Sequence, residues 1–243
     1  MIALLRKEIS SFFSSLIGYI VIIVFLVAIG LFMWILPGDF NVMDGGYSTL
    51  DTLFMLAPWI FLFLVPAVTM RLFAEEKRSG TIELLLTRPL TDLQIVLAKY
   101  FAGLILVLFA LLPSLVFFLS VYLLGDPVGN IDTGGTWGSY IGLFFLAAVY
   151  VAIGVFSSSL SQNQIISFII ATILSFFFFI GFESIGTLAL FGGFGDSIAG
   201  LGISGHYRSM SRGVIDTRDM IYFICVIAAF VILTKTVLQS RKW

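Results

Sequence analysis

The feature of this sequence that most limits its possible folds is a series of long apolar stretches that are almost free of charge. A helix that crosses a hydrocarbon core about 30 Å thick needs roughly 17–25 mostly apolar residues. Six stretches reach that length, and the last is interrupted only by Lys235, which can extend to the interface from a helix end. They are Ile17–Leu36, Leu53–Met70, Tyr100–Leu124, Tyr140–Leu160, Ile165–Phe182 and Met220–Leu238. The sequence therefore predicts six membrane-spanning helices.

The composition agrees with this interpretation and excludes several soluble classes. Hydrophobic residues make up 60% of the chain and charged residues 11%, whereas soluble domains average about 45–50% and about 25%. A mean hydropathy of +1.11 leaves too little polar surface for a soluble enzyme, a nucleic-acid-binding domain or a disordered region. Continuous runs such as Phe176–Phe179 differ from the alternating segments of a membrane β-barrel. We expect an all-α integral membrane protein in a lipid bilayer, with no nucleic-acid partner.

The residues needed for most catalytic and metal sites are missing. One cysteine, Cys225, excludes an intramolecular disulfide and a cysteine-cluster metal site, and one histidine, His206, excludes sites built from several histidines. The sequence also lacks the G-x-x-x-x-G-K-[ST] loop for nucleotide phosphates and the H-E-x-x-H and G-x-S-x-G motifs. We expect no catalytic residue, no metal and no cofactor in this chain, which is therefore not predicted to be an enzyme.

The basic residues predict how the helices cross the membrane. Ten of the 13 lie before the first span, between the second and third spans, or at the end of the sixth, while the loops 37–52 and 125–139 contain none. Lysines and arginines in short loops mark the cytoplasmic side. We therefore expect a multi-pass protein of the inner (cytoplasmic) membrane with both termini in the cytoplasm and with Arg208, Arg212 and Arg218 outside.

The loop 183–219 allows one alternative topology. Gly186–Ser204 is apolar enough for a seventh span, and that topology leaves the same number of basic residues inside. Six glycines and Asp196 make this segment a poor lipid-exposed helix. We expect interfacial or re-entrant helices there, and the sequence does not decide between the two. Because no repeat or linker divides the chain, we interpret residues 1–243 as one domain with a retained first span.

The N-terminal segment 1–16 has the pattern of an amphipathic helix. Apolar residues recur every three or four positions from Ile2 to Leu16, and Arg6, Lys7 and Glu8 fall mostly on the other face. Such a helix lies in the membrane interface. It serves either as an anchor for the first span or as an elbow helix that moves during a transport cycle.

The cytoplasmic segment 71–99 predicts a short helix held between two breaks. Gly80 ends the helix that leaves the second span, and Thr81 is suited to cap a new one. This helix ends near Thr87 because Pro89 disfavours a helical conformation at the preceding residue. The run Thr91–Gln94 then matches a capping box. The short helix is either an interfacial helix or an element that inserts into a cleft of a cytoplasmic partner.

The run from Ala74 to Leu90, AEEKRSGTIELLLTRPL, resembles the signature of ABC-2 type transporter permeases. Lys7–Ser15, Ala57–Arg71 and Ser211–Asp219 further resemble the gliding-motility-associated permease subfamily (GldF type). The resemblance implies a permease subunit of an ATP-driven exporter whose short cytoplasmic helix docks on a separate ATPase, which binds the ATP and Mg²⁺. The coupling residues that it implies are Glu75, Glu76, Gly80, Thr81, Ile82, Glu83, Leu84, Leu85, Leu86 and Pro89.

The same resemblance implies further partners and leaves rivals open. It implies a second permease copy or a homologous subunit in a dimer, and a companion membrane subunit of the gliding machinery. The rivals are an ABC-2 permease for another substrate, such as one for copper-site maturation, and a non-transporting scaffold of a motility or secretion complex. A wide cavity lined by hydroxyl groups and kinked prolines would favour transport. The transported substrate is not identifiable from the sequence.

Two arginines in the outer loop form the last candidate site. Arg208 and Arg212 are four residues apart, which places them on one face if the segment is helical. They form either a basic lip for an anionic export substrate or a contact for lipid headgroups or a periplasmic partner. Glu183 follows the fifth span directly, and we expect this edge position to be solvated.

Overall fold

The computed structural model describes residues 1–87, 89–188 and 194–240, without the side chains of Ile17 and Leu86. Every regular element in these residues is a helix, and six helical segments are long and apolar enough to cross a membrane. The segments are Gly18–Ile35, Asp51–Arg78, Asp92–Leu124, Thr133–Leu160, Gln164–Gly186 and Thr217–Gln239. The predicted all-α membrane fold with six spans is confirmed.

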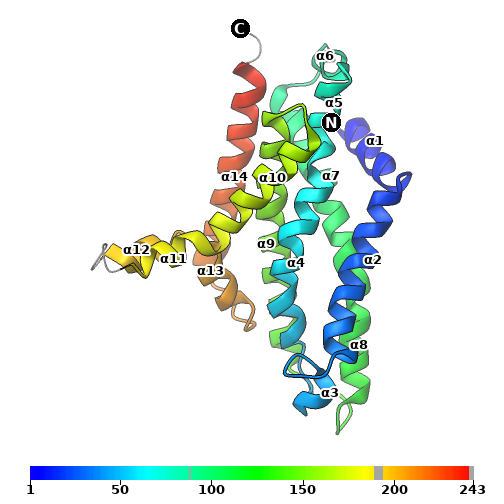
Figure 1. Cartoon of the computed structure of the whole chain (residues 1–243), viewed down its shortest axis with the longest axis vertical. Helices are drawn as coiled ribbons and strands as arrows, with labels where there is room; N and C mark the ends of the chain where they lie inside the picture. The colour runs from blue at the N-terminus through cyan, green and yellow to red at the C-terminus, as the bar shows by residue number, and fades with distance from the viewer. Residues whose placement is uncertain (88, 189–193, 241–243) are drawn as a thin grey trace.

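The helices follow one another along the chain with short connections (Figure 1). The first half contains α1 (Ile2–Phe13), α2 (Leu16–Gly30), η1 (Leu31–Ile35), α3 (Val42–Gly45), α4 (Asp51–Thr69), α5 (Arg71–Arg78), α6 (Thr81–Leu86) and α7 (Asp92–Leu111). The second half contains η2 (Leu112–Ser114), α8 (Leu115–Leu124), α9 (Thr133–Leu160), α10 (Gln164–Phe176), η3 (Phe177–Gly181), α11 (Phe182–Gly186), α12 (Gly195–Ala199), α13 (Ile203–Met210) and α14 (Thr217–Gln239).

The fourth span, α9, forms the centre of the bundle. In its most apolar window 78% of the residues are buried, compared with 22–56% in the other five spans. It contacts α4, α7, α10 and α14. Gly154 of α9 faces Thr69 of α4 with no space for a side chain between them, and such small residues let two helix backbones approach closely.

Several span boundaries differ from the sequence prediction because polar residues extend the helices, and the starts of the fourth and third spans show how. The fourth span begins at Thr133 rather than Tyr140, since Asp132 caps it by accepting a 2.9 Å hydrogen bond from Gly135 N. The third begins at Asp92 rather than Tyr100 behind its own cap. Polar first turns are invisible to a search for charge-free stretches, although both caps carry the side chains that helix starts prefer.

The elements of interest for function gather at one end of the bundle. Figure 1 shows α1, α5, α6 and the end of α14 at the same end, drawn at the top. The segment 71–99 connects the second and third spans, and the N-terminal helix and the end of the sixth span lie at the same end. The region 183–219 forms short helices at a different level, where α11 and α12 leave the bundle sideways (Figure 1). Residues 189–193 of the candidate seventh span lie outside the described residues.

Candidate functional site

The second span continues past a break in its backbone, and a side chain from α9 bridges that break. α4 ends at Thr69 and α5 begins at Arg71. The buried Ser158 accepts hydrogen bonds from Phe73 N at 2.9 Å and Ala74 N at 3.1 Å, and it donates one to Met70 O at 2.8 Å. A kink is stable when an inserted group satisfies the freed backbone atoms. α5 is thereby fixed to the end of α9.

The chain between α5 and α6 turns sharply at Gly80. This residue has φ of +71°, a conformation that favours glycine. The Ser79 hydroxyl donates a 2.9 Å hydrogen bond to Glu75 O and lies 2.8 Å from Thr81 Oγ1. The predicted break at Gly80 is present. The prediction that Thr81 caps α6 is wrong, because Gly80 is the cap residue and Thr81 is the first residue of the helix.

α6 presents one apolar side chain outward and another inward. Leu84 is 68% exposed, whereas Ile82 is buried. Glu83 is exposed and Leu85 is half-buried. The side chain of Leu86 and all of Arg88 lie outside the described residues. The described part of the chain therefore leaves most of the Leu84 side chain of this short amphipathic helix uncovered.

The second break, after α6, also has a fixed geometry. Pro89 is exposed, and Thr91 caps α7 by accepting a 3.3 Å hydrogen bond from Gln94 N. The Gln94 side chain accepts a 3.1 Å bond from Thr91 N in return. The predicted capping box is confirmed. The start of α7 consequently has a defined geometry.

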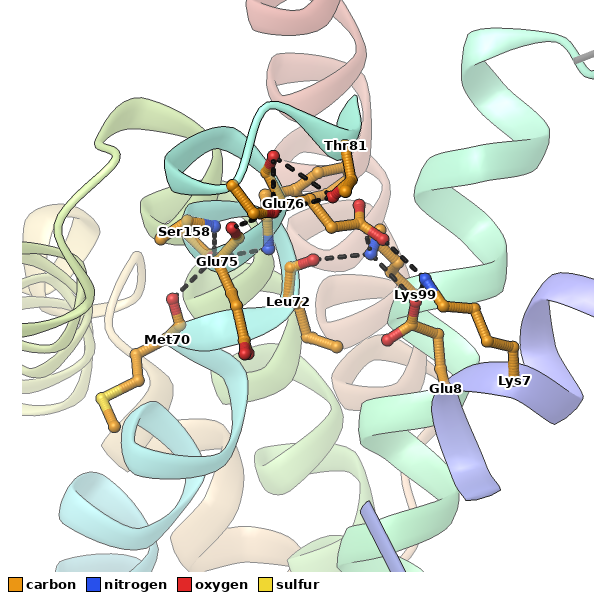
Figure 2. A network of polar contacts seen from close by, with 12 residues as sticks. Lys7, Glu8, Met70, Leu72, Glu75, Glu76, Thr81, Lys99 and Ser158 are labelled. Atoms are coloured by element: carbon orange, nitrogen blue, oxygen red, sulfur yellow. Dashed lines mark hydrogen bonds and ion pairs between the residues drawn. The ribbon is translucent and has the colours of Figure 1, made fainter. Parts of the chain in front are cut away.

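A buried ion-pair network supports α5 from below (Figure 2). The fully buried Lys99 of α7 lies 3.1 Å from Glu8 Oε1 and 2.9 Å from Glu76 Oε2. Its ammonium also donates to Leu72 O at 2.5 Å. Lys7 reaches Glu76 Oε1 at 3.0 Å from the solvent side. The network joins α1, α5 and α7.

The two adjacent acidic residues of the coupling motif therefore differ in their surroundings. Glu76 is largely buried in the network, while Glu75 is exposed. An ATPase that docks at this end would meet Glu75 but not the carboxylate of Glu76. The resemblance implies one role for both residues, whereas their contacts separate them.

The N-terminal helix differs from the simple amphipathic prediction at one residue. Glu8 was assigned to the polar face but is buried together with Leu4 and Phe12, four positions before and after it. Arg71 lies over the Phe12 ring at 4.4 Å from its centroid and donates a 3.0 Å hydrogen bond to Ser15. The Leu4–Glu8–Phe12 spacing was the available signal for a buried acid. No residue near Glu8 in the sequence indicates that its partner is Lys99, 91 residues away.

The Lys7 ammonium is held in its charged form by the same carboxylates. Partial burial lowers its pKa, but the hydrogen bond and the charges of Glu76 and Glu8 raise the pKa by more, so that it lies above its ordinary value. The Lys7 ammonium at the solvent edge of the network is accordingly charged at physiological pH.

A groove of about 360 Å³ lies between α1 and α6. It combines apolar side chains of both helices with Lys7 and Glu76 at one edge. Its lining residues are Ala3, Leu4, Lys7, Glu76, Thr81, Leu84 and Leu85. The surface available to a partner therefore includes the N-terminal helix as well as α6.

The outer-loop candidates do not form the predicted pair. α13 ends at Met210 and Gly213 follows with φ of +82°, so Arg212 lies beyond the helix rather than on one face with Arg208. Arg208 instead lies 3.1 Å from Glu183 Oε1, and Ser204 donates to the other oxygen of that carboxylate at 2.5 Å. Glu183 is thus a partner of Arg208 and not simply a solvated residue at the span edge.

A larger cavity of about 670 Å³ lies among α4, η3, α11 and α13. Its walls are mainly aromatic and apolar, with four charged groups and two serines. The lining residues are Asp51, Phe54, Met55, Pro58, Trp59, Phe179, Ile180, Glu183, Ser204, Tyr207, Arg208, Ser211 and Arg212. Burial raises the pKa of Tyr207 well above its ordinary value, and its hydroxyl donates to Phe54 O at 2.6 Å. That bond fixes α13 to the second span.

The single histidine joins α13 to the start of α14. His206 Nδ1 lies 2.7 Å from Asp219 Oδ1, and its Nε2 lies 3.0 Å from Gly200 O. The ring stacks on Tyr222 with centroids 3.9 Å apart. In residues 1–87, 89–188 and 194–240, no group of three or more His, Cys, Asp and Glu side chains is arranged to hold a metal ion.

Comparison with known proteins gives one match. Residues 39–194 match the model of a family described as ABC-2 family transporter protein. The matched region is more than half of the chain, and it includes α4 to α10 with the whole of the segment 71–99. No curated protein matches the chain significantly.

Proposed function

Since the chain belongs to the ABC-2 transporter family, we propose that it is the permease subunit of an ATP-driven exporter and that α6 docks on a separate ATPase. The ATPase supplies the nucleotide site, with its ATP and Mg²⁺, that the motifs of this chain do not provide. Closure of the ATPase on ATP pushes α6, and the spans rearrange as rigid bodies.

The observation that carries this proposal is the exposure of Leu84 on a helix with structured ends. Leu84 is 68% exposed, so most of its apolar side chain is not covered by the described residues of this chain. α6 lies with α1 and the end of α14 at one end of the bundle (Figure 1), where the basic residues concentrate. Helix-in-groove recognition uses such apolar anchors on short helices. The exposed Glu83 beside it offers a carboxylate to a donor of the partner.

We test docking with the double variant Glu83→Ala/Leu84→Ala. Removing an anchor from a protein interface commonly costs more than about 1 kcal/mol, and about 2 kcal/mol or more for a central anchor. The ATPase should therefore co-purify with this variant in a smaller amount, or its hydrolysis should no longer respond to the permease. Membrane insertion should be normal, because both side chains lie outside the predicted hydrophobic stretches.

The matched control is Asp196→Ala/Leu201→Ala, which removes an exposed acid and an exposed leucine in the loop 183–219. This control should bind the ATPase as well as the unaltered permease does. If the Glu83→Ala/Leu84→Ala variant also retains normal association and coupled hydrolysis, α6 is an interfacial helix and the docking proposal is wrong.

The cavity supports transport over a scaffold role. A scaffold requires tight packing and no cavity, whereas the 670 Å³ cavity is lined by Pro58, a proline within α4, together with Ser204 and Ser211. These are the side chains that were expected to mark a transport pathway. Arg208 and Arg212 lie in its lining, and we propose that they contact the polar part of the exported molecule.

We further propose that this exporter belongs to the gliding-motility machinery of the inner membrane, as a dimer with a second permease copy or a homologous subunit and with a companion membrane subunit. The support is the similarity of Lys7–Ser15, Ala57–Arg71 and Ser211–Asp219 to that permease subfamily. Deletion of the protein should abolish movement over surfaces. Normal gliding after deletion would contradict the proposed role in gliding and would leave the permease proposal unchanged.

A further inference from the structure

One buried lysine joins three elements that are distant in the sequence. Lys99 of α7 has an exposed fraction of 0%, and its ammonium carries three N–H donors. Its three neighbours are Glu8 Oε1 of α1 at 3.1 Å, Glu76 Oε2 of α5 at 2.9 Å and Leu72 O of α5 at 2.5 Å (Figure 2). Lys99 donates hydrogen bonds to Glu8 Oε1 and Leu72 O and forms an ion pair with Glu76 Oε2, so its contacts belong to two different helices.

The network contains equal numbers of positive and negative groups. Lys7 adds a second ammonium, 3.0 Å from Glu76 Oε1 and 3.7 Å from Glu8 Oε1. Two positive and two negative groups then share one site. Buried ions are stable only while they remain paired, and breaking such a pair costs far more than shifting an apolar contact. The network consequently resists displacement of α1 or α5 relative to α7.

The same network lies directly beneath the helix that faces the partner. Glu76 is on α5, and the Thr81 hydroxyl at the start of α6 hydrogen-bonds to Glu76 O at 3.4 Å. The Ser79 hydroxyl, directly after α5, donates a 2.9 Å hydrogen bond to Glu75 O. A displacement of α6 therefore reaches α5, and through Glu76 it reaches the ammonium of Lys99.

We infer that Lys99 is a positioning residue for energy coupling: it holds α1, α5 and α7 as one rigid body, so that movement of α6 is passed to the first and third spans. This inference rests on the proposed function, in which α6 receives the push of an ATPase. It assigns no substrate contact to Lys99. Its role is to keep three spans in register with the docking helix.

Three variants separate this role from simple stability. Lys99→Met leaves the two carboxylates without their ammonium. The triple variant Glu8→Gln/Glu76→Gln/Lys99→Met removes the three buried charges and leaves only the Lys7 ammonium, whose side chain is 61% exposed. It should therefore fold even if the single variant does not. The double variant Lys7→Met/Glu8→Gln removes both ion-pairing residues of α1 and leaves Lys99 paired with Glu76. Lys235→Met is the matched control, with the same substitution on a half-buried lysine of α14.

The first measurement uses the purified permease in lipid nanodiscs without any ATPase. Spin labels at Ala3 and Arg78 report the distance between α1 and α5, and labels at Arg78 and Leu93 report that between α5 and α7, with Cys225→Ser as the background. The unaltered network should give two narrow distance distributions. The triple variant should broaden both, and Lys7→Met/Glu8→Gln should broaden only the first.

The second measurement uses the complex with the co-purified ATPase. Labels at the exposed Val128 and Val214, on loops away from α6, report movement that has crossed the bundle. ATP with vanadate should shift this distance in the unaltered complex and in Lys235→Met. The shift should be lost in the triple variant, although the ATPase remains associated because the outer surface of α6 is unchanged.

Narrow distributions in the triple variant, or a normal shift between Val128 and Val214, would overturn the inference. Failure of the unaltered permease to associate with an ATPase would instead refute the proposed function. The nanodisc distances would still decide whether Lys99 holds the three helices together, so the two failures are distinguishable.

Discussion

Single side chains fix the geometry of the end of the bundle that carries α6 more than helix propensity does. Ser158 satisfies three backbone groups at the break between α4 and α5. Lys99 donates hydrogen bonds to Glu8 and to Leu72 O and forms an ion pair with Glu76. Both side chains are buried. Because an unsatisfied buried polar group is costly, each of these residues determines where a neighbouring helix lies.

Ser158→Ala should destabilise the protein and loosen α5. It leaves Phe73 N and Ala74 N without their acceptor, at a cost of about 1–3 kcal/mol for each unpaired group. Thermal unfolding in detergent and amide hydrogen exchange at residues 73 and 74 measure the effect. The control is Ser157→Ala, whose hydroxyl donates only to Ile153 O within its own helix. Equal stability and exchange in the two variants would contradict this account of the break.

At the level of elements, the sequence predicts those features that depend only on residues close together in the chain. The six spans follow from apolar length, and α6 follows from a glycine that adopts positive φ and from the Thr91–Gln94 capping box. These signals act within a few residues of the structure they specify. The prediction errs where one residue can take either of two local roles, as with Thr81, which is the first residue of α6 rather than its cap.

The contacts that define the site are not local and have weaker signals. Glu8 and Lys99 are 91 residues apart, and Glu183 and Arg208 are 25 apart. Charge counting uses Lys99 only as a topology marker, since nothing adjacent to it in the sequence indicates a carboxylate partner. The pairing depends on how α1 packs against α7, which periodicity within each helix does not specify.

For the molecule as a whole, the asymmetry of basic residues and the common position of α1, α6 and the end of α14 support one orientation (Figure 1). With six spans, an even number, the N-terminal helix and the end of α14 lie on the same side. The loop 183–219 lies on the other side in this arrangement. In the orientation that we propose, the ion-pair network faces the cytoplasm, where an ATPase would have access to α6.

Reporter fusions test this topology. A reporter after Trp243 and one within residues 71–99 should both report the cytoplasm, whereas a reporter near Gly200 should report the outside, because ten of the 13 basic residues favour retention on the cytoplasmic side. A cytoplasmic signal from a reporter at Arg208 would contradict the six-span topology and favour a seventh span through Gly186–Ser204.

The central claim is that α6 meets an ATPase through its outer apolar surface, and site-specific photocrosslinking in intact cells tests it most directly. A photoreactive amino acid at Leu84 should form a crosslink to a protein that mass spectrometry identifies as an ABC-type ATPase, while the same amino acid at Leu201, an equally hydrophobic exposed position in the outer loop, should not. Crosslinks from Leu84 to lipid alone, or to the same proteins as from Leu201, would contradict the claim and leave α6 as a helix of the membrane interface.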